Sequence, residues 1–194
     1  MNKYIDSTLL DRAICFAVKA HANTERREKG FPYIVHPLEA VAIVATMTND
    51  QELLAAAVLH DTVEDTDTTI EELRALFGER VADLVVIESD VEVEGMTHDE
   101  SWQIRKQAAI DRLAAASREA KMVALGDKLS NMRAIARDYA EMGEAVWQKF
   151  AVKEKAPHAW HYRGLAASLS ELKDTFAYQE FVTLLNKVFP LKGS

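Results

Sequence analysis

The feature that most constrains this chain is an apolar helical run that stops abruptly at a cluster of ionisable side chains. Residues 53–59 are all apolar and rich in good helix formers, so they predict a buried helix. The seven residues that follow, from His60 to Thr66, are His-Asp-Thr-Val-Glu-Asp-Thr. Because this change falls where the buried helix should end, we expect the chemistry of the protein to be located there.

Helical periodicity extends through almost the whole chain, and no convincing alternating strand, repeat or low-complexity linker interrupts it. The expected fold class is therefore all-α. Ser7 is a plausible N-cap for the first helix, Gly78 is a C-terminal stop, and Gly95 lies in an acidic loop over residues 90–100. The expected helices are about 7–22, 37–47, 51–59, 69–77, 80–88, 102–116, 119–139, 143–152, 157–172 and 176–188.

Length and composition predict one domain over residues 1–194, with the helices from about 141 completing the fold. The chain has 194 residues, of which 48% are hydrophobic, enough for one substantial core. The net charge of −8 argues against a broad nucleic-acid surface, which would need many Lys and Arg contacts to phosphate. The sequence does not indicate an oligomeric state.

The single cysteine, Cys15, excludes an internal disulfide framework and fits a reducing compartment. It falls within an apolar helix pattern, so we expect a small core residue and not a nucleophile. No signal peptide or apolar run long enough to span a bilayer is evident, which makes the cytoplasm the expected location.

Four residues of two metal-binding types, in the order H…HD…D, predict a metal site: His36, His60, Asp61 and Asp127. Imidazole and carboxylate groups form a mixed nitrogen and oxygen site that suits Mn, Fe, Zn or Ni, with no thiolate present. Pro37 favours a helix start and pushes His36 out of the α region, which would put His36 just ahead of its helix.

Each part of this pattern also has a purely structural interpretation. His36 could be a loop or cap residue, and Asp127 could be a surface carboxylate paired with Lys128 or Arg133. Glu64 and Asp65 could be an acidic loop ahead of a capping box that starts at Thr69. We favour the metal site because four potential ligands in the right order, at helix ends or within apolar helices, are an improbable coincidence.

From about Ala13 to Arg137 the chain resembles the HD-domain phosphohydrolases, and within them the hydrolase domain of the Rel/SpoT alarmone enzymes. It is most similar to the stand-alone small alarmone hydrolases of the metazoan SpoT kind. The bare His-Asp doublet is weakly specific, whereas the segment from His60 to Thr66 is highly specific to this group. The similarity is carried by residues 17–21, 26–27, 32–37, 55–66, 77–78 and 127–131.

The resemblance implies an all-α HD-domain bundle with a metal site in a central cleft. His36, His60, Asp61 and Asp127 match the metal ligands, normally of Mn²⁺. The residues that match other functional positions are Glu64 and Asp65, which orient and activate water, and Arg26, Arg27, Asn131 and Tyr162, which contact substrate.

The implied activity is metal-dependent hydrolysis of the 3′-pyrophosphate of guanosine tetra- or pentaphosphate, giving GDP or GTP and pyrophosphate. The residues themselves agree with hydrolysis of a phosphate ester or anhydride, because a metal acidifies water and a nearby carboxylate can take the proton. Three alternatives stay open: an HD phosphohydrolase acting on adenosine alarmones, one acting on NADPH or nucleoside 5′-monophosphates, and a non-catalytic nucleotide-sensing module.

Two segments depart from the pattern of the family. Residues 28–31 do not fit its commonest spacing, and Glu28 adds a negative charge beside the basic pair Arg26 and Arg27. Residues 89–101 are unusually acidic. The resemblance therefore constrains the type of reaction more tightly than it constrains substrate affinity and nucleotide selectivity.

Overall fold

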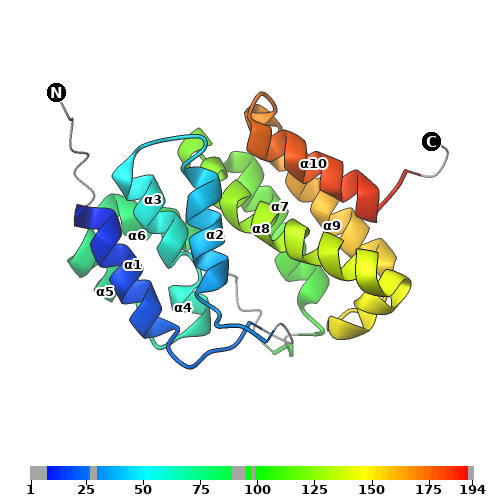
Figure 1. The fold of residues 1–194 in the computed structure, drawn as a ribbon, viewed down its shortest axis with the longest axis horizontal. Coiled ribbons are helices and arrows are strands. Elements are labelled where there is room, and N and C mark those ends of the chain that lie inside the picture. Colours follow the sequence, from blue (N-terminus) through cyan, green and yellow to red (C-terminus); the bar gives the residue numbers. More distant parts are fainter. Residues whose placement is uncertain (1–7, 27–29, 89–94, 98, 192–194) are drawn as a thin grey trace.

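The all-α class is confirmed by the computed structural model, which describes residues 8–26, 30–88, 95–97 and 99–191 (Figure 1). Within these residues the only strand-like pairing is an isolated antiparallel bridge between Glu25 and Pro32. The helical elements are α1 (Thr8–Ala20), α2 (Val35–Val44), α3 (Gln51–Leu59), α4 (Thr62–Asp65), α5 (Ile70–Phe77), α6 (Glu79–Glu88), α7 (Trp102–Ala115), α8 (Arg118–Met142), η1 (Gly143–Lys149), α9 (Lys155–Ser168), η2 (Ser170–Leu172) and α10 (Phe176–Val188).

Most expected helices are found within two or three residues of their predicted limits, and α3 and α10 coincide with them. Three predictions were wrong in detail. The helix expected over 143–152 is a shorter 3-10 helix, the one expected over 157–172 breaks after Ser168, and the short α4 was not anticipated. Ser7, the expected cap of α1, lies outside the described residues.

Several helix starts are explained by local side-chain caps. The side chain of Thr69 accepts a hydrogen bond from the backbone N–H of Glu72, which satisfies one of the free donors at the start of α5. Asp50 caps α3 in the same way by accepting from the backbone N–H of Glu52. These caps fix where α3 and α5 begin, and the cap at Thr69 thereby ends the short connection, containing α4, that follows α3.

Helix α8 is the central element and packs against α2, α3 and α10 (Figure 1). One apolar cluster involves α1, α3, α5 and α6, and a second joins α8 to α9 and α10. The approach of α8 to α2 is very close at Gly126, where a Cβ atom would lie 2.8 Å from the carbonyl oxygen of Ala40. The absence of a side chain at this position therefore lets α2 and α8 meet directly beside Asp127.

The apolar pattern of the first helix led to a wrong prediction of burial for Cys15. Cys15 is exposed, because the buried face of α1 is formed by Ala13 and Ala17. The prediction that Cys15 is a core residue was therefore wrong. Among the described residues, no helix has the length and apolar character required to cross a membrane.

Candidate metal centre and substrate cavity

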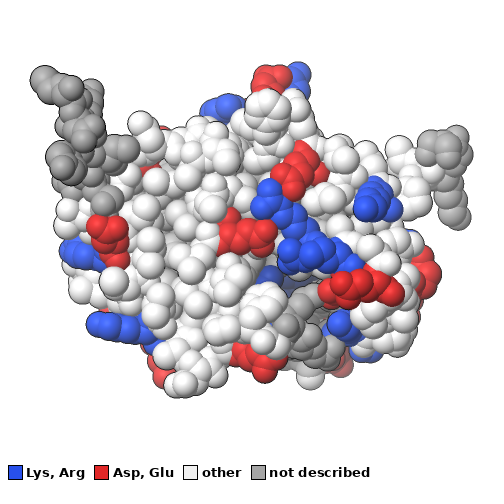
Figure 2. All heavy atoms as spheres, viewed as in Figure 1, with Lys and Arg blue, Asp and Glu red and all other residues white. Residues whose placement is uncertain are grey.

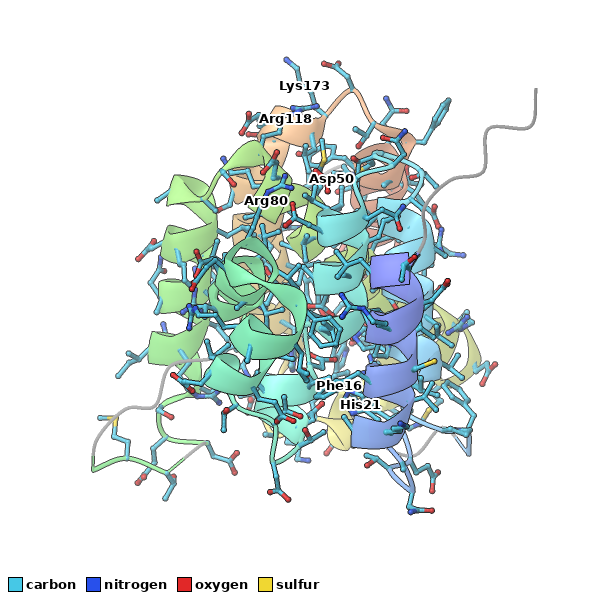
Figure 3. All side chains as sticks on the ribbon, turned by 90° about the vertical axis from the view of Figure 1, so that its left-hand side faces the viewer. Phe16, His21, Asp50, Arg80, Arg118 and Lys173 are labelled. Atoms are coloured by element: carbon cyan, nitrogen blue, oxygen red, sulfur yellow. The ribbon has the colours of Figure 1, made fainter. Side chains whose placement is uncertain are left out.

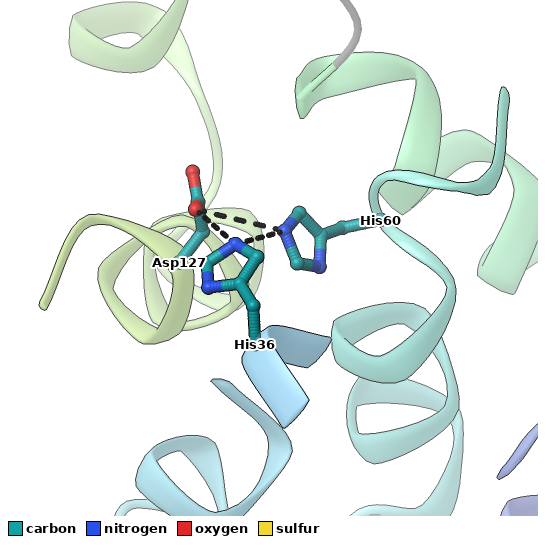
Figure 4. A group of neighbouring side chains, drawn as sticks. All are labelled: His36, His60 and Asp127. Carbon is teal, nitrogen blue, oxygen red and sulfur yellow. Dashed lines mark hydrogen bonds and ion pairs between the residues drawn. The ribbon is translucent and has the colours of Figure 1, made fainter. Parts of the chain in front are cut away.

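Three segments far apart in the chain bring the predicted metal ligands together. His36 lies in the first turn of α2, His60 directly follows α3, and Asp127 lies in the middle of α8 (Figure 4). All three residues are buried. The two apolar helices and the close α2–α8 packing thus carry these polar groups into the interior, where they face one another.

The position of His36 differs from the sequence prediction in one respect. Helix α2 begins at Val35, so His36 is already helical and was wrongly placed ahead of the helix. A turn in which the backbone N–H of His36 donates to the carbonyl of Tyr33 leads the chain into the helix. Pro37 is tolerated there because the N–H that it lacks would have no partner in the first helical turn.

The ligand atoms of His36, His60 and Asp127 lie within 4.8 Å of one another. Nε2 of His36 is 3.3 Å from Nε2 of His60 and 3.1 Å from Oδ1 of Asp127, and Nε2 of His60 is 3.6 Å from the same oxygen. We call these three residues the donor triad. Two imidazoles and a carboxylate converging in a buried site fit a divalent transition-metal ion.

Asp61 adjoins the donor triad without belonging to that set of mutually close atoms. Its Oδ2 atom lies 3.0 Å from Nε2 of His60 and 3.3 Å from Nε2 of His36. The same oxygen accepts a 2.7 Å hydrogen bond from the hydroxyl group of Tyr33. The structure thus brings all four predicted ligands together, with Asp61 held in place by a tyrosine.

Mutual attraction dominates the electrostatics of this group. Burial lowers the pKa of His60, but the Asp61 and Asp127 carboxylates outweigh this effect and hold the pKa well above its ordinary value. Burial alone would raise the pKa values of Asp61 and Asp127. The charges and hydrogen bonds of their partners, His60 for Asp61 and Lys128 for Asp127, instead hold both well below the usual range.

Lys128 brings a positive charge to the edge of the donor triad. Its Nζ atom contacts Oδ2 of Asp127 and lies 3.0 Å from Oε2 of Glu88. Burial lowers the pKa of Lys128, but these two carboxylates outweigh burial and raise it well above the ordinary value. The ammonium group is therefore charged beside the site.

The donor triad lies in the wall of a cavity of about 300 Å³. Polar and charged side chains surround the triad, and aromatic side chains form another part of the wall. Residues lining the cavity are Arg26, Tyr33, His36, His60, Asp61, Glu64, Asp65, Glu88, Trp102, Lys106, Ala109, Asp127, Lys128, Asn131, Phe150, His158, His161, Tyr162 and Leu165.

The predicted water-activating pair and three of the four predicted substrate contacts line this same cavity. Glu64 and Asp65 are exposed on α4, the turn that follows the His60–Asp61 doublet. Arg26 donates a hydrogen bond to Oδ1 of Asn131 and lies over the ring of Tyr33, 5.1 Å from its centroid. The fourth predicted contact, Arg27, lies outside the described residues.

Two of the predicted substrate contacts, Asn131 and Tyr162, interact with Asp127 of the donor triad. Asn131 does so by a hydrogen bond along α8, and Tyr162 by an electrostatic interaction. Asn131 donates a 2.5 Å hydrogen bond to Oδ1 of Asp127, one turn earlier in the same helix, because residues four apart lie on one helical face. Burial, followed by the charge of Asp127, raises the pKa of Tyr162, so that its hydroxyl group stays protonated. Asn131 thus connects Arg26 to a predicted metal ligand.

Several residues that line the cavity had no role predicted from the sequence. Trp102 and Lys106 both belong to α7. The indole ring of Trp102 and the side chain of Lys106 line the cavity together because the two residues share one helical face. His158 is buried, and it packs edge-to-face against Trp102 with ring centroids 5.5 Å apart. The i,i+4 spacing of Trp102 and Lys106 was the sequence pattern from which their common position on one helical face could have been predicted.

Figure 2 shows Lys and Arg side chains gathered beside a hollow on the face where α8 runs, with acidic side chains next to them. Positive charge is thus concentrated locally although the chain as a whole carries a net charge of −8. Such a distribution suits a small anionic ligand better than an extended polyanion.

Fold and site together define a helical protein with a histidine–aspartate metal centre, and comparison with known proteins agrees. The family described as HD domain matches residues 13–155, and the chain belongs to this family. It is 38% identical, over 142 residues, to the guanosine-3′,5′-bis(diphosphate) 3′-pyrophosphohydrolase MESH1 of Danio rerio. That alignment covers 71% of this chain and 74% of the zebrafish protein.

Two further similarities support this assignment. The chain is 34% identical over 165 residues to the guanosine-3′,5′-bis(diphosphate) 3′-pyrophosphohydrolase of Aquifex aeolicus, covering 85% of this chain but 23% of that longer protein. A solved structure of a metazoan SpoT orthologue, described as hydrolysing ppGpp, superposes with a TM-score of 0.77 at 24% identity, covering 97% of this chain and 99% of that one. The resemblance identified from the sequence motifs is therefore confirmed.

Proposed function

We propose that this protein hydrolyses the 3′-pyrophosphate of guanosine tetra- or pentaphosphate, giving GDP or GTP and pyrophosphate. The observation that carries the proposal is the meeting, in one cavity, of the buried donor triad, two exposed carboxylates, and the cations Arg26 and Lys128. The relatives from zebrafish and Aquifex, which are named for this activity, support it.

His36, His60, Asp61 and Asp127 would hold one divalent metal ion, and Mn²⁺ is the ion we propose. When bound, such an ion neutralises charge on a phosphoryl oxygen and acidifies water. The residues fit this role because their donor atoms converge and because the Nδ1 atoms of both histidines are engaged by oxygen atoms on the far side. An ion held by these four side chains would also be able to bind water and substrate.

Glu64 and Asp65 would orient the attacking water and take its proton. The water oxygen forms a bond to the phosphorus attached to the ribose 3′ oxygen. The bond between that phosphorus and the 3′ oxygen breaks in line with the attack, and the 3′ oxygen takes up a proton. Since both carboxylates are exposed on α4, they can exchange protons with solvent between turnovers.

Arg26, Arg27 and Asn131 would bind the phosphates and ribose, and Tyr162 would contact the nucleoside. Guanidinium groups suit a compact diphosphate because they form paired hydrogen bonds to its oxygens. The aromatic part of the cavity wall, which includes Trp102, offers a stacking surface for the base. We further propose that residues 1–194 form one domain, completed by the helices from about 141, and that the protein acts in the cytoplasm on a small nucleotide.

The decisive experiment incubates the protein with Mn²⁺ and guanosine tetraphosphate and separates the products by chromatography. Equal amounts of GDP and pyrophosphate are expected. The Asp127→Ala variant is the matched control and should lose bound metal and activity together. Orthophosphate as the sole small product, or activity confined to adenosine alarmones, NADPH or nucleoside 5′-monophosphates, would replace this proposal with one of those alternatives.

A further inference from the structure

The Nδ1 atoms of the two imidazoles in the donor triad have different kinds of hydrogen-bond partner. Nδ1 of His60 lies 2.8 Å from the backbone carbonyl oxygen of Ala57. A carbonyl oxygen only accepts hydrogen bonds, so Nδ1 of His60 must carry the proton. Nδ1 of His36 instead lies 2.8 Å from the hydroxyl oxygen of Ser130, a group that can either donate or accept. The backbone therefore orients His60, whereas His36 depends on a side chain.

Glu39 decides which role Ser130 plays. The hydroxyl group of Ser130 donates a 2.7 Å hydrogen bond to Oε2 of Glu39. A carboxylate only accepts, and a hydroxyl group has a single proton to give. Ser130 Oγ must then accept the hydrogen bond from Nδ1–H of His36, which leaves Nε2, the atom that faces His60 and Asp127, as the nitrogen that can bind a metal ion.

Glu39 is itself anchored through its second carboxylate oxygen. Oε1 accepts a 3.1 Å hydrogen bond from Arg133, and Arg133 makes two 2.7 Å hydrogen bonds to the carboxylate of Glu180. The hydrogen bonds to Glu180, outweighing burial, raise the pKa of Arg133, so the guanidinium group stays charged. The series joins α2, α8 and α10 and keeps the carboxylate of Glu39 in one orientation.

Ser130 and Glu39 border a second cavity, of about 340 Å³, that His36 also lines. The side chain of Glu39 is 28% exposed, whereas that of His36 is 3% exposed. Glu39 can consequently be replaced without opening the apolar core. This makes its effect on His36 separable from its effect on folding.

We propose that Ser130 and Glu39 are positioning residues that hold a proton on Nδ1 of His36 and so leave Nε2 as the atom that binds the metal ion. Partners of this kind behind a metal-binding histidine set its orientation and tautomer and influence metal affinity by about 10- to 100-fold. The inference rests on the metal centre that the proposed function requires, and it is independent of which nucleotide is hydrolysed.

The first test reads the tautomer in metal-free protein by long-range ¹H–¹⁵N NMR of the histidine rings at mildly alkaline pH, with His36→Gln used for assignment. Unmodified protein should show His36 protonated at Nδ1. In Glu39→Ala the hydroxyl proton of Ser130 is released to donate to Nδ1, so the Nε2–H tautomer should increase. The proposal is overturned if Nδ1 of His36 carries no proton in the unmodified protein, or if Glu39→Ala leaves the protonation of Nδ1 unchanged.

The second test reads Mn²⁺ affinity by calorimetry. Glu39→Ala and Ser130→Ala should each weaken binding by about 10-fold, whereas Ser130→Thr, which keeps a hydroxyl group, should restore it. Arg133→Ala is the control for a purely structural role, because it cuts the connection to α10 but leaves the Ser130–Glu39 pair. It should lower the melting temperature with a smaller effect on affinity.

Equal losses of Mn²⁺ affinity in Arg133→Ala and Glu39→Ala would show that the series only holds helices together, and would overturn the inference. Neither test involves a nucleotide. A protein that passes both but releases no pyrophosphate from guanosine tetraphosphate would refute the proposed function while leaving the role of Ser130 and Glu39 intact.

Discussion

The hydroxyl group of Tyr33 donates a 2.7 Å hydrogen bond to Oδ2 of Asp61, the oxygen that also lies 3.0 Å from Nε2 of His60. Burial raises the pKa of Tyr33 far above its ordinary value, and the neighbouring carboxylates raise it further. The hydroxyl group therefore stays protonated, and able to donate, at pH values above the ordinary pKa of tyrosine. Tyr33 thus orients the predicted metal ligand Asp61, and in the sequence it lies three residues before another predicted ligand, His36.

Tyr33→Phe should weaken Mn²⁺ binding by about 10-fold, because Asp61 loses the donor that fixes its carboxylate. Calorimetric titration of the metal-free protein measures the effect. Tyr139→Phe is the matched control, since its hydroxyl group is bonded to Glu144 at an exposed position and should leave metal affinity unchanged. Equal affinity in both variants would show that Asp61 needs no orienting partner.

Glu64→Gln and Asp65→Asn should retain the metal and the fold while turnover falls by about 10²-fold or more. The reason is that each variant keeps the size of the side chain but removes a carboxylate able to take a proton from water. Metal content by mass spectrometry and initial rates on guanosine tetraphosphate separate the two effects. Near-normal turnover in both variants would leave these residues with a structural role only.

Arg26→Ala should raise KM for the nucleotide, because a guanidinium group at the cavity wall is lost. Arg26→Lys should recover part of the affinity, since it keeps the charge without the planar group. Steady-state kinetics measures both, and Arg74→Ala, a surface arginine paired with Glu79 and Asp83, serves as the control. Unchanged KM and kcat in Arg26→Ala would exclude a role in substrate binding.

Stability at low pH should depend on Asp50, which caps α3 and lies 2.9 Å from Arg80 (Figure 3). Burial raises the pKa of Asp50, but the hydrogen bond from Arg80 and backbone donors outweigh it and leave the pKa below 3.8. The stabilisation is therefore fully present above pH 3.8 and is lost as the pH falls through the lower pKa of the folded state.

Asp50→Ala should lower the free energy of unfolding at neutral pH by about 1 kcal/mol, with a smaller loss in Asp50→Asn, which keeps a capping oxygen. Urea denaturation at a series of pH values measures both. The difference between unmodified protein and Asp50→Asn should vanish at the acid end of the series. Asp174→Asn, at an exposed position, is the control, and a difference that persists undiminished in acid would contradict the assignment.

The sequence alone determined the positions of most helices and the chemical character of the centre. Apolar runs at helical spacing predicted α3 and α10 at their observed limits, because local periodicity is enough to define a helix that buries one or more faces. The order of His36, His60, Asp61 and Asp127 likewise indicated a metal site, because imidazole and carboxylate groups at the ends of apolar helices or within them are typical of metal ligands.

Only the tertiary structure determined how these residues meet and what orients them. The close contact at Gly126 brings α8 against α2, and no local pattern specifies a contact between residues more than 80 positions apart. For the same reason, no sequence pattern predicted the hydrogen bond between Tyr33 and Asp61 or the one between Ser130 and Glu39. Hydrogen bonds of this kind depend on the three-dimensional positions of side chains from different helices, which are set by packing and not by the spacing of residues along the chain.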